Sequence, residues 1–322
     1  MPVHITIRWL HRTTDKNLDF GVPAAARKGT IVSENIEWTE DQWNRVRQVV
    51  HDEALNARVA ASFLPLYGPL PSDTVAVPIN QLQPIPDGAT NARLEVDDYT
   101  TMRLTTLSVN VYLKNSQVAD PELSSAMIMF RRAADIIARL EDALIFNGQE
   151  NVGAGPKGGA GTSHLTPVYS INGGHENPGL LGAEGAKTVD ITGDFETPGQ
   201  AVFHSIVDAI QCLEGQGHYG PFACAMGDDL FRDITRPMPS SMVLPRDSIL
   251  PFLNGPLCRT SAVPSKSAVV ISLQGAPVEI VVPGDISVRY LQTTSDAEHV
   301  FRVQQKFALR VKEAKAIATF TL

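Results

Sequence analysis

The sequence predicts an α+β fold, and three observations carry this prediction. Apolar residues make up 43% of the 322 residues and charged residues 19%, which is typical of a globular protein with a sizeable core. Apolar side chains recur at spacings of three and four in two long segments of the first half of the chain, as they do in amphipathic helices. From Ala268 onward, short apolar segments are separated by turns such as QGAP and PGD, which indicates β-strands.

The net charge and the cysteine content exclude several classes of protein. A formal net charge of -8 argues against a nucleic-acid-binding surface over the whole molecule, but not against a local basic segment. Cys212, Cys224 and Cys258 form no C-x-x-C pair, so we expect neither a disulfide framework nor a cysteine-rich zinc site. The sequence shows no signal peptide and no apolar stretch long enough to span a membrane. These features predict a protein made and used in the cytosol, without a membrane partner.

The first 32 residues differ in character from the rest of the chain. They hold five basic and two acidic residues, a net charge of +3, and Gly21, Pro23 and Gly29 interrupt any helical period. The basic residues are Arg8, Arg12, Lys16, Arg27 and Lys28. This composition predicts an extended arm that becomes ordered only against another surface, with a frayed terminus as the alternative.

A helix is expected to begin just after Trp38. Thr39 and Gln42 have the spacing of a capping box, and an apolar stripe follows them. The stripe consists of Trp43, Val46, Val50, Ala54 and Ala57. It predicts an amphipathic helix of about five turns that ends before Pro65.

An extended excursion follows a proline-rich connection. Residues 92–114 alternate between apolar and polar side chains, and the turn PIPDGATN precedes them. This pattern predicts a long two-stranded excursion from the body. A free hairpin is barely stable in water, so we expect the excursion to lie on another surface or another subunit.

A long helix forms the spine of the predicted fold. Asp120 is placed to cap it, Pro121 to occupy its first position, and Gly148 to end it. A glycine-rich loop is expected at 151–194, and a second helix from Thr197 to Gly215. The segments after it predict a strand at 222–226, a short helix from Asp228 to Arg236, and a terminal sheet.

No sequence pattern indicates catalysis, a cofactor or a metal. Residues 153–158 match G-x-G-x-x-G, but a helix precedes them and a loop follows, the wrong context for a dinucleotide site. Glu141 and Asp142 are neighbours in the spine helix and point about 100° apart, so we expect ion pairing with nearby arginines rather than acid–base chemistry. Those arginines are Arg131, Arg132 and Arg139. The histidines show no metal-binding spacing, and no G-x-S-x-G is present. We therefore predict a protein that is not an enzyme. The alternative, a monomeric hydrolase or nucleotide enzyme, would need a catalytic site assembled from residues far apart in the sequence.

Four segments carry a family resemblance. They are WTEDQWNRVRQVVHDEALNAR (38–58) with the LYGP that follows it at 66–69, ARLEDALIFNGQ (138–149), GHYGPFACAMGDDLF (217–231) and the whole C-terminal β segment (268–322). In this order they resemble the encapsulin (linocin-type) shell proteins, whose fold is that of tailed-phage major capsid proteins of the Hong Kong phage type.

The resemblance implies a phage-capsid-type, encapsulin-like fold of six parts. They are an N-terminal arm at 1–37, the first helix and connection of a peripheral domain at 38–75, an extended loop at 76–112, the spine helix and glycine-rich loop of the peripheral domain at 113–194, an axial domain at 195–260, and a terminal β segment shared between both domains at 261–322.

The implied function is a structural shell protein that assembles into an icosahedral capsid. The arm before the first helix and the glycine-rich insertion depart from encapsulins and favour the major capsid protein of a tailed bacteriophage, located in the virion and assembled in the host cytoplasm. The arm of such a capsid would contact packaged double-stranded DNA non-specifically. The alternative is a cytoplasmic encapsulin nanocompartment that encloses a cargo enzyme. The partners would be other copies of the chain, in pentamers or also hexamers, with accessory capsid proteins in a phage.

Candidate contact residues follow by analogy with this family. Those for subunit contacts in the arm are Arg8, Trp9 and Arg12; in the extended loop, Arg93, Asp97, Asp98 and Arg103; and in the axial domain, Pro237, Pro239 and Pro245. Trp43, Val46 and Val50 would face the cargo of an encapsulin. The position of Trp43 on an apolar stripe also fits a core residue, whereas Trp9 has no local core and is the better interface candidate.

Overall fold

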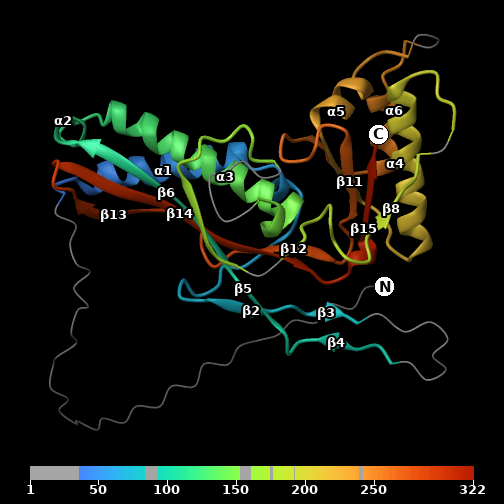
Figure 1. The fold of residues 1–322 in the computed structure, drawn as a ribbon, viewed down its shortest axis with the longest axis horizontal. Helices are drawn as coiled ribbons and strands as arrows, with labels where there is room; N and C mark the ends of the chain where they lie inside the picture. The colour runs from blue at the N-terminus through green and yellow to red at the C-terminus, as the bar shows by residue number, and fades with distance from the viewer. Residues whose placement is uncertain (1–35, 84–92, 153–160, 175–176, 192, 239–241) are drawn as a thin grey trace, which may run out of the picture. The chain divides into compact units, whose positions relative to one another are not determined.

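The computed structural model describes residues 36–83, 93–152, 161–174, 177–191, 193–238 and 242–322 (Figure 1). Residues 36–322 form one compact unit that contains two large sheets. The predicted arm contacts Arg8, Trp9 and Arg12, and Pro239 of the axial domain, lie outside the described residues. No helix in the described part of the chain is long and apolar enough to cross a membrane.

A six-stranded sheet forms the base of the first half of the unit. Its strands run in the order β1-β12-β14-β6-β7, and β13 also pairs with β14. Their bounds are β1 (Leu66–Tyr67), β6 (Thr105–Lys114), β7 (Tyr169–Gly173), β12 (Val278–Val281), β13 (Ser287–Thr293) and β14 (Glu298–Val311). The longest pairing joins β6 and β14, antiparallel from Lys114 opposite Glu298 to Thr105 opposite Phe307.

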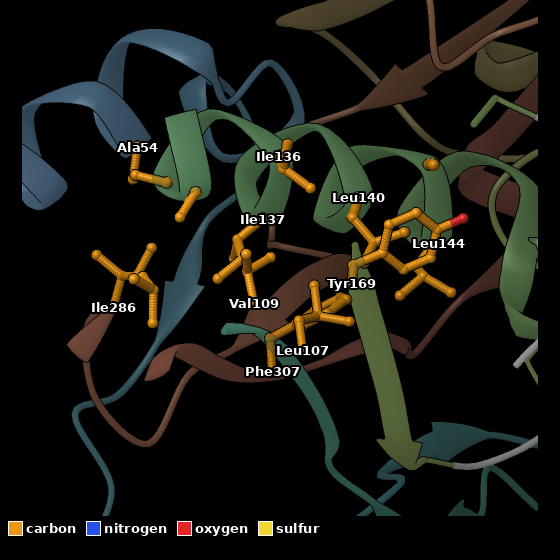
Figure 2. Packing of buried hydrophobic residues seen from close by; sticks show 14 of the residues in the cluster. Ala54, Leu107, Val109, Ile136, Ile137, Leu140, Leu144, Tyr169, Ile286 and Phe307 are labelled. Carbon is orange, nitrogen blue, oxygen red and sulfur yellow. The ribbon is translucent and has the colours of Figure 1, made fainter. Parts of the chain in front are cut away.

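Two helices cover one face of this sheet. They are α1 (Glu40–Ala57) and α3 (Ser124–Val152). The period-two pattern of β6 places Leu107 and Val109 on this face, and Figure 2 shows Ile137, Leu140 and Leu144 of α3 packed against them. The predicted alternation of β6 and the apolar period of the spine helix are therefore confirmed as two sides of one core.

The first helix begins as the sequence predicts. The Thr39 side chain accepts a hydrogen bond from the Gln42 backbone N–H, and the Gln42 side chain accepts one from the Thr39 N–H, which completes the capping box. Just before the cap, the Trp38 ring stacks on Phe301 of β14 with 4.8 Å between centroids. Trp43 and Phe130 pack edge-on around this pair and join the helices to the sheet.

The spine helix differs from its prediction at the start and agrees at the end. It begins at Ser124, not Pro121, because Asp120 accepts hydrogen bonds from the Glu122 and Ser124 backbone N–H groups and Leu123 has a left-handed φ of 52°. Gly148 has φ 81° and ψ 162°, so regular helical geometry breaks at the predicted residue, although helical turns resume and continue to Val152.

A five-stranded sheet forms the second half of the unit. Its order is β10-β9-β11-β15-β8, with bounds β8 (Lys187–Thr188), β9 (Phe222–Met226), β10 (Leu257–Arg259), β11 (Ser267–Ser272) and β15 (Ile317–Thr321). One face packs on α4 (Pro198–Gly215), α5 (Asp228–Ile234) and α6 (Pro245–Leu253), whereas Ala225, Val269 and Ile317 on the other face join the core of the spine helix. The sheet is thus buried on both faces.

The extended loop consists of two short ladders. β2 (Ala76–Pro78) pairs with β5 (Thr101–Arg103), and β3 (Gln81–Leu82) pairs with β4 (Val96–Asp97). The predicted two-stranded excursion is confirmed, but its predicted end at residue 112 is wrong, because β6 from Thr105 onward lies between β14 and β7 in the main sheet. Short elements complete the fold: the 3-10 turns η1 (Ala60–Ser62) and η2 (Ala314–Ala316), and the one-turn helix α2 (Asn115–Val118).

Candidate functional site

The root of the extended loop rests on a buried ion pair. Arg310 of β14 and Glu279 of β12 lie directly opposite each other in the ladder, and both are almost fully buried. The Arg310 Nε donates to the Glu279 carboxylate at 2.5 Å, and Lys312 Nζ lies 3.2 Å from the other carboxylate oxygen. The Glu279 carboxylate therefore contacts two cations. These contacts compensate the cost of removing its charge from water.

The same arginine holds the loop. Its Nη1 donates to the Pro78 carbonyl of β2 at 3.1 Å, and its guanidinium lies 4.3 Å from the centroid of the Tyr67 ring. The Leu82 N–H donates to the Lys312 carbonyl at 2.9 Å. The loop is thus fixed to the end of β14 at two points.

Beyond this root, the loop exposes large apolar side chains. Leu94 is 77% exposed, Val96 53% and Tyr99 92%. The small core at the root consists of Val77, Met102, Leu104, Val281 and Ala308. Large apolar side chains exposed on one short segment of the described loop are typical of a surface that becomes buried on association.

The four predicted contact residues of the loop lie on this segment. Arg93, Asp98 and Arg103 are exposed. Asp97 is half-buried and accepts hydrogen bonds from the Tyr99 and Thr100 N–H groups, and its bonds with Thr100 lower the pKa of its carboxyl. Asp97 therefore shapes the turn of the loop, while the other three present charge to solvent.

Of the described prolines predicted as subunit contacts of the axial domain, one is exposed and one is buried. Pro237 is exposed, but Pro245 is buried at the first turn of α6, against Gly199, so its prediction as a contact residue is wrong. The exposed apolar groups of this region are instead Met242, Leu250 and Phe252. These three residues could not be proposed from the sequence, because Pro245 and Pro251 make the segment of α6 resemble a loop.

The three residues predicted to face cargo lie in the core. Trp43, Val46 and Val50 are 6%, 0% and 0% exposed and pack between α1, α3 and the sheet. Their burial contradicts the cargo-facing prediction and supports the core interpretation of Trp43, because an apolar stripe on a helix covers the neighbouring layer before any further partner can reach it.

A pocket of about 450 Å³ lies beside α1 instead. It is lined by Asn44, Arg47, Gln48 and His51 of α1 and by Asp285, Ile286, Ser287 and Val288 at the start of β13. His51 Nδ1 is in close contact with the Asp285 carboxylate, and Arg47 donates to Glu40 at 2.9 Å. The lining is mainly polar, with Ile286 and Val288 as its apolar residues.

Glu141 and Asp142 are buried and do not pair with the arginines predicted for them. Arg58, at the end of α1, lies 3.0 Å from the Glu141 carboxylate, and Asp142 accepts hydrogen bonds from the Val59 and Ala60 N–H groups. Arg132 and Arg139 bind Asp135, and Arg131 binds Glu53. Burial raises the pKa of Glu141, which Arg58 opposes, and raises the pKa of Asp142 to about 7. These contacts join α1 to the spine helix.

The three cysteines are free thiols. Within the described ranges, no group of three or more His, Cys, Asp or Glu side chains could hold a metal ion.

Several solved structures are similar to this fold over most of the chain. The virus-like particle of Pyrococcus furiosus has a TM-score of 0.60 at 14% identity, covering 87% of this chain and 99% of that one. The capsid of the Myoviridae phage XM1 has a TM-score of 0.53 at 13% identity over 81% of this chain and 90% of that one. The SrpI encapsulin of Synechococcus elongatus has a TM-score of 0.52 at 13% identity over 81% and 86%. The fold is therefore that of the encapsulin and phage capsid proteins.

The sequence defines the family more narrowly. The linocin M18 family, described as encapsulating protein for peroxidase, matches residues 32–158 and 169–308, and the chain belongs to this family. The type 1 encapsulin shell protein EncA of Myxococcus xanthus is 27% identical over 87% of this chain and 92% of its own length. A diheme-cytochrome-encapsulin shell fusion protein of Kuenenia stuttgartiensis is 25% identical over 89% of this chain and 75% of its own length.

These relatives reverse the order of the two functions predicted from the sequence. The arm and the glycine-rich insertion favoured a phage capsid, but the family match begins at residue 32 and continues on both sides of the insertion. The match includes most of the glycine-rich region 151–194 and leaves residues 1–31 of the arm outside it. The likeness to phage capsids is one of fold, at 13% identity or less in the phage structures compared.

Proposed function

We propose that this chain is the shell protein of an encapsulin compartment, a closed protein shell in the cytoplasm that encloses a cargo protein. The observation that carries the proposal is similarity in sequence, over 87% of the chain, to a protein named as an encapsulin shell. The fold supports a structural, shell-forming role and leaves the chemistry to the enclosed partner.

Self-association is supported by the extended loop. Among the described residues, its apolar side chains Leu94, Val96 and Tyr99 are largely exposed, and Arg310 holds its root. A loop of this kind makes heterologous contacts, in which one patch meets a different patch on the next copy, and such contacts close into rings and shells. Many weak contacts then give a stable particle through effective concentration.

The pocket beside α1 is the proposed cargo contact. Since α1 presents Asn44, Gln48 and His51 there, the outward side of the helix would bind cargo while its apolar stripe stays in the core. The arm residues Arg8, Trp9 and Arg12 are proposed to contact a neighbouring copy.

Electron microscopy of particles isolated from the native cell tests the shell proposal. We expect tailless closed shells with a co-purifying protein and no genome-length DNA. Particles filled with DNA or attached to tails would instead establish a phage capsid, and the absence of any particle would overturn both.

A pocket-filling variant tests the cargo contact separately. Ser287→Trp introduces a large ring at the pocket wall, and we expect assembled shells that have lost the co-purifying protein. Ser295→Trp, at an exposed position outside the pocket, is the matched control and should retain the cargo. Retention of cargo by Ser287→Trp would place the cargo contact elsewhere.

A further inference from the structure

Among the described residues, one cation lies beside the buried acid pair of the spine helix. Glu141 is 1% exposed and Asp142 3%. Arg58 is the cation beside them, with its Nε 3.0 Å from the Glu141 carboxylate. Asp142 is held by two neutral donors, the N–H groups of Val59 and Ala60, at 2.8 and 2.9 Å.

The surrounding charges do not supply the missing compensation. Arg58 also lies 3.7 Å from Asp285, a third carboxylate, which in turn contacts His51. On the other side of Asp142 is a hollow of about 340 Å³, whose charged and titratable lining groups besides Asp142 are Arg139, His164, Asp228 and Arg259. The thiol of Cys258 also lies near Asp142. Arg139 is bound to Asp135 and Arg259 to Asp228. Among the described residues, no cation lies within 4.0 Å of the Asp142 carboxylate.

The other buried carboxylates of this protein are compensated differently. Asp135, two turns earlier on the same helix, binds both Arg132 at 2.6 Å and Arg139 at 2.7 Å. Glu279 binds both Arg310 and Lys312. Each of these acids has two cations, whereas Glu141 and Asp142 together share one. A buried carboxylate without a cation is costly, and protonation removes that cost.

We propose that Asp142 binds a proton at neutral pH and acts as a proton-dependent latch that fixes the end of α1 to the spine helix. When the proton leaves, two adjacent buried carboxylates share Arg58. Their burial and mutual repulsion destabilise the folded state, and the Val59 and Ala60 N–H bonds, which favour the charged form of Asp142, offset only part of this cost. The latch is thus closed in mild acid and weakened in alkali.

The direction in which folding stability changes with pH follows from the difference in proton binding between the folded and unfolded states. Burial raises the pKa of Asp142 to about 7, above the unfolded-state value of about 3.9. The folded protein therefore binds more protons than the unfolded chain between these values. The stabilisation from this group is complete below the unfolded-state pKa and is lost as the pH rises through about 7.

Infrared titration of the purified full-length protein tests the proposal. A protonated carboxyl group has a carbonyl stretch distinct from that of a carboxylate, and surface Asp and Glu side chains are already ionised above pH 6. Between pH 9 and pH 6, we expect this band to appear in the wild type with a midpoint near 7. It should be lost in Asp142→Asn and retained in Glu279→Gln, a buried control that leaves Arg58 and Arg139 with their partners.

A second variant keeps the test decisive if Asp142→Asn does not fold. Glu141→Gln removes the neighbouring charge and frees Arg58, so we expect the midpoint to shift to lower pH. The free energy of unfolding of the wild type, measured by chemical denaturation, should be lower at pH 9 than at pH 6, and this difference should be smaller in Glu141→Gln. A wild type without the carboxyl band, or a band that persists in Asp142→Asn, would overturn the proposal.

Discussion

Arg310 joins three parts of the protein through one side chain. It pairs with Glu279 in the sheet, donates to the Pro78 carbonyl of the extended loop and covers the Tyr67 ring. A single guanidinium can do this because its donors are arranged in a rigid planar fork, which a lysine does not have. The geometry of the loop root therefore depends on this side chain.

Removal of Arg310 should be costly. In Arg310→Met, the buried Glu279 loses its main cation and the Pro78 carbonyl loses its donor, so we expect a loss of about 3–5 kcal/mol in unfolding free energy. Chemical denaturation followed by the fluorescence of Trp38 and Trp43, both buried in the core, measures this loss. The double variant Glu279→Met, Arg310→Met removes both partners and should recover part of it. A loss below about 1 kcal/mol in the single variant would contradict a structural role for the pair.

At the scale of the element, the regular geometry of the spine helix is interrupted near its C-terminal end, where residues 177–181 bond to it. Gly148 leaves helical geometry, and the Gln149 N–H donates to the Asn177 carbonyl. The N–H groups of Leu180 and Leu181 then donate to the Ile145 and Phe146 carbonyls. The last helical carbonyls are thus satisfied by the 177–181 segment, which fixes the end of the glycine-rich region to the helix.

We expect Gly148→Ala to destabilise the protein by about 2 kcal/mol or more, because the left-handed φ is strained for alanine and its Cβ would lie 2.0 Å from the Asn177 oxygen. Gly215→Ala, at the end of α4, is the control. A Cβ there meets nothing within 4 Å, so we expect no loss or a small gain of about 0.5–1 kcal/mol. Thermal unfolding of both variants measures the difference, and equal melting temperatures would contradict the strain at Gly148.

At the scale of the whole molecule, we expect assembly to depend on the exposed apolar side chains of the extended loop. The double variant Leu94→Ser, Tyr99→Ser removes apolar surface that makes few contacts within the subunit, so we expect fewer particles with unchanged circular dichroism and tryptophan fluorescence. Leu55→Ser, which changes an exposed apolar residue of α1, is the control and should assemble normally. Light scattering measures particle yield, and equal yields would show that the loop is not an assembly contact.

The sequence predicted elements well where the signal is local. The capping box of α1, the start of α4 at Thr197–Pro198 and the break at Gly148 all depend on residues within a few positions of one another. The sequence-based predictions were wrong where the position of a segment depends on contacts with residues far away in the chain. The alternation of 105–113 is the same for a free hairpin and a sheet strand, and only its pairing with β14 places it in the body.

The candidate sites show the same division. The apolar stripe predicts that Trp43, Val46 and Val50 are buried, but it does not show which surface covers them. The pattern is the same for a helix that packs on its own core and for one that binds cargo. Arg58, the partner of Glu141, lies far away in sequence, whereas the predicted arginine partners lie within a few turns and bind other acids. The pocket beside α1 joins two segments more than 200 residues apart, and no sequence spacing reveals it.

The continuous path from the extended loop into the central strand has a mechanical consequence. β5 of the loop leads directly into β6, which pairs with β14 from Thr105 to Lys114. A pull from a neighbouring subunit along β6 would load this ladder in shear, so its hydrogen bonds would resist together and not open one by one. The strand β6, which leads out of the loop, would then bear the pulling force on the subunit when a filled shell is under internal pressure.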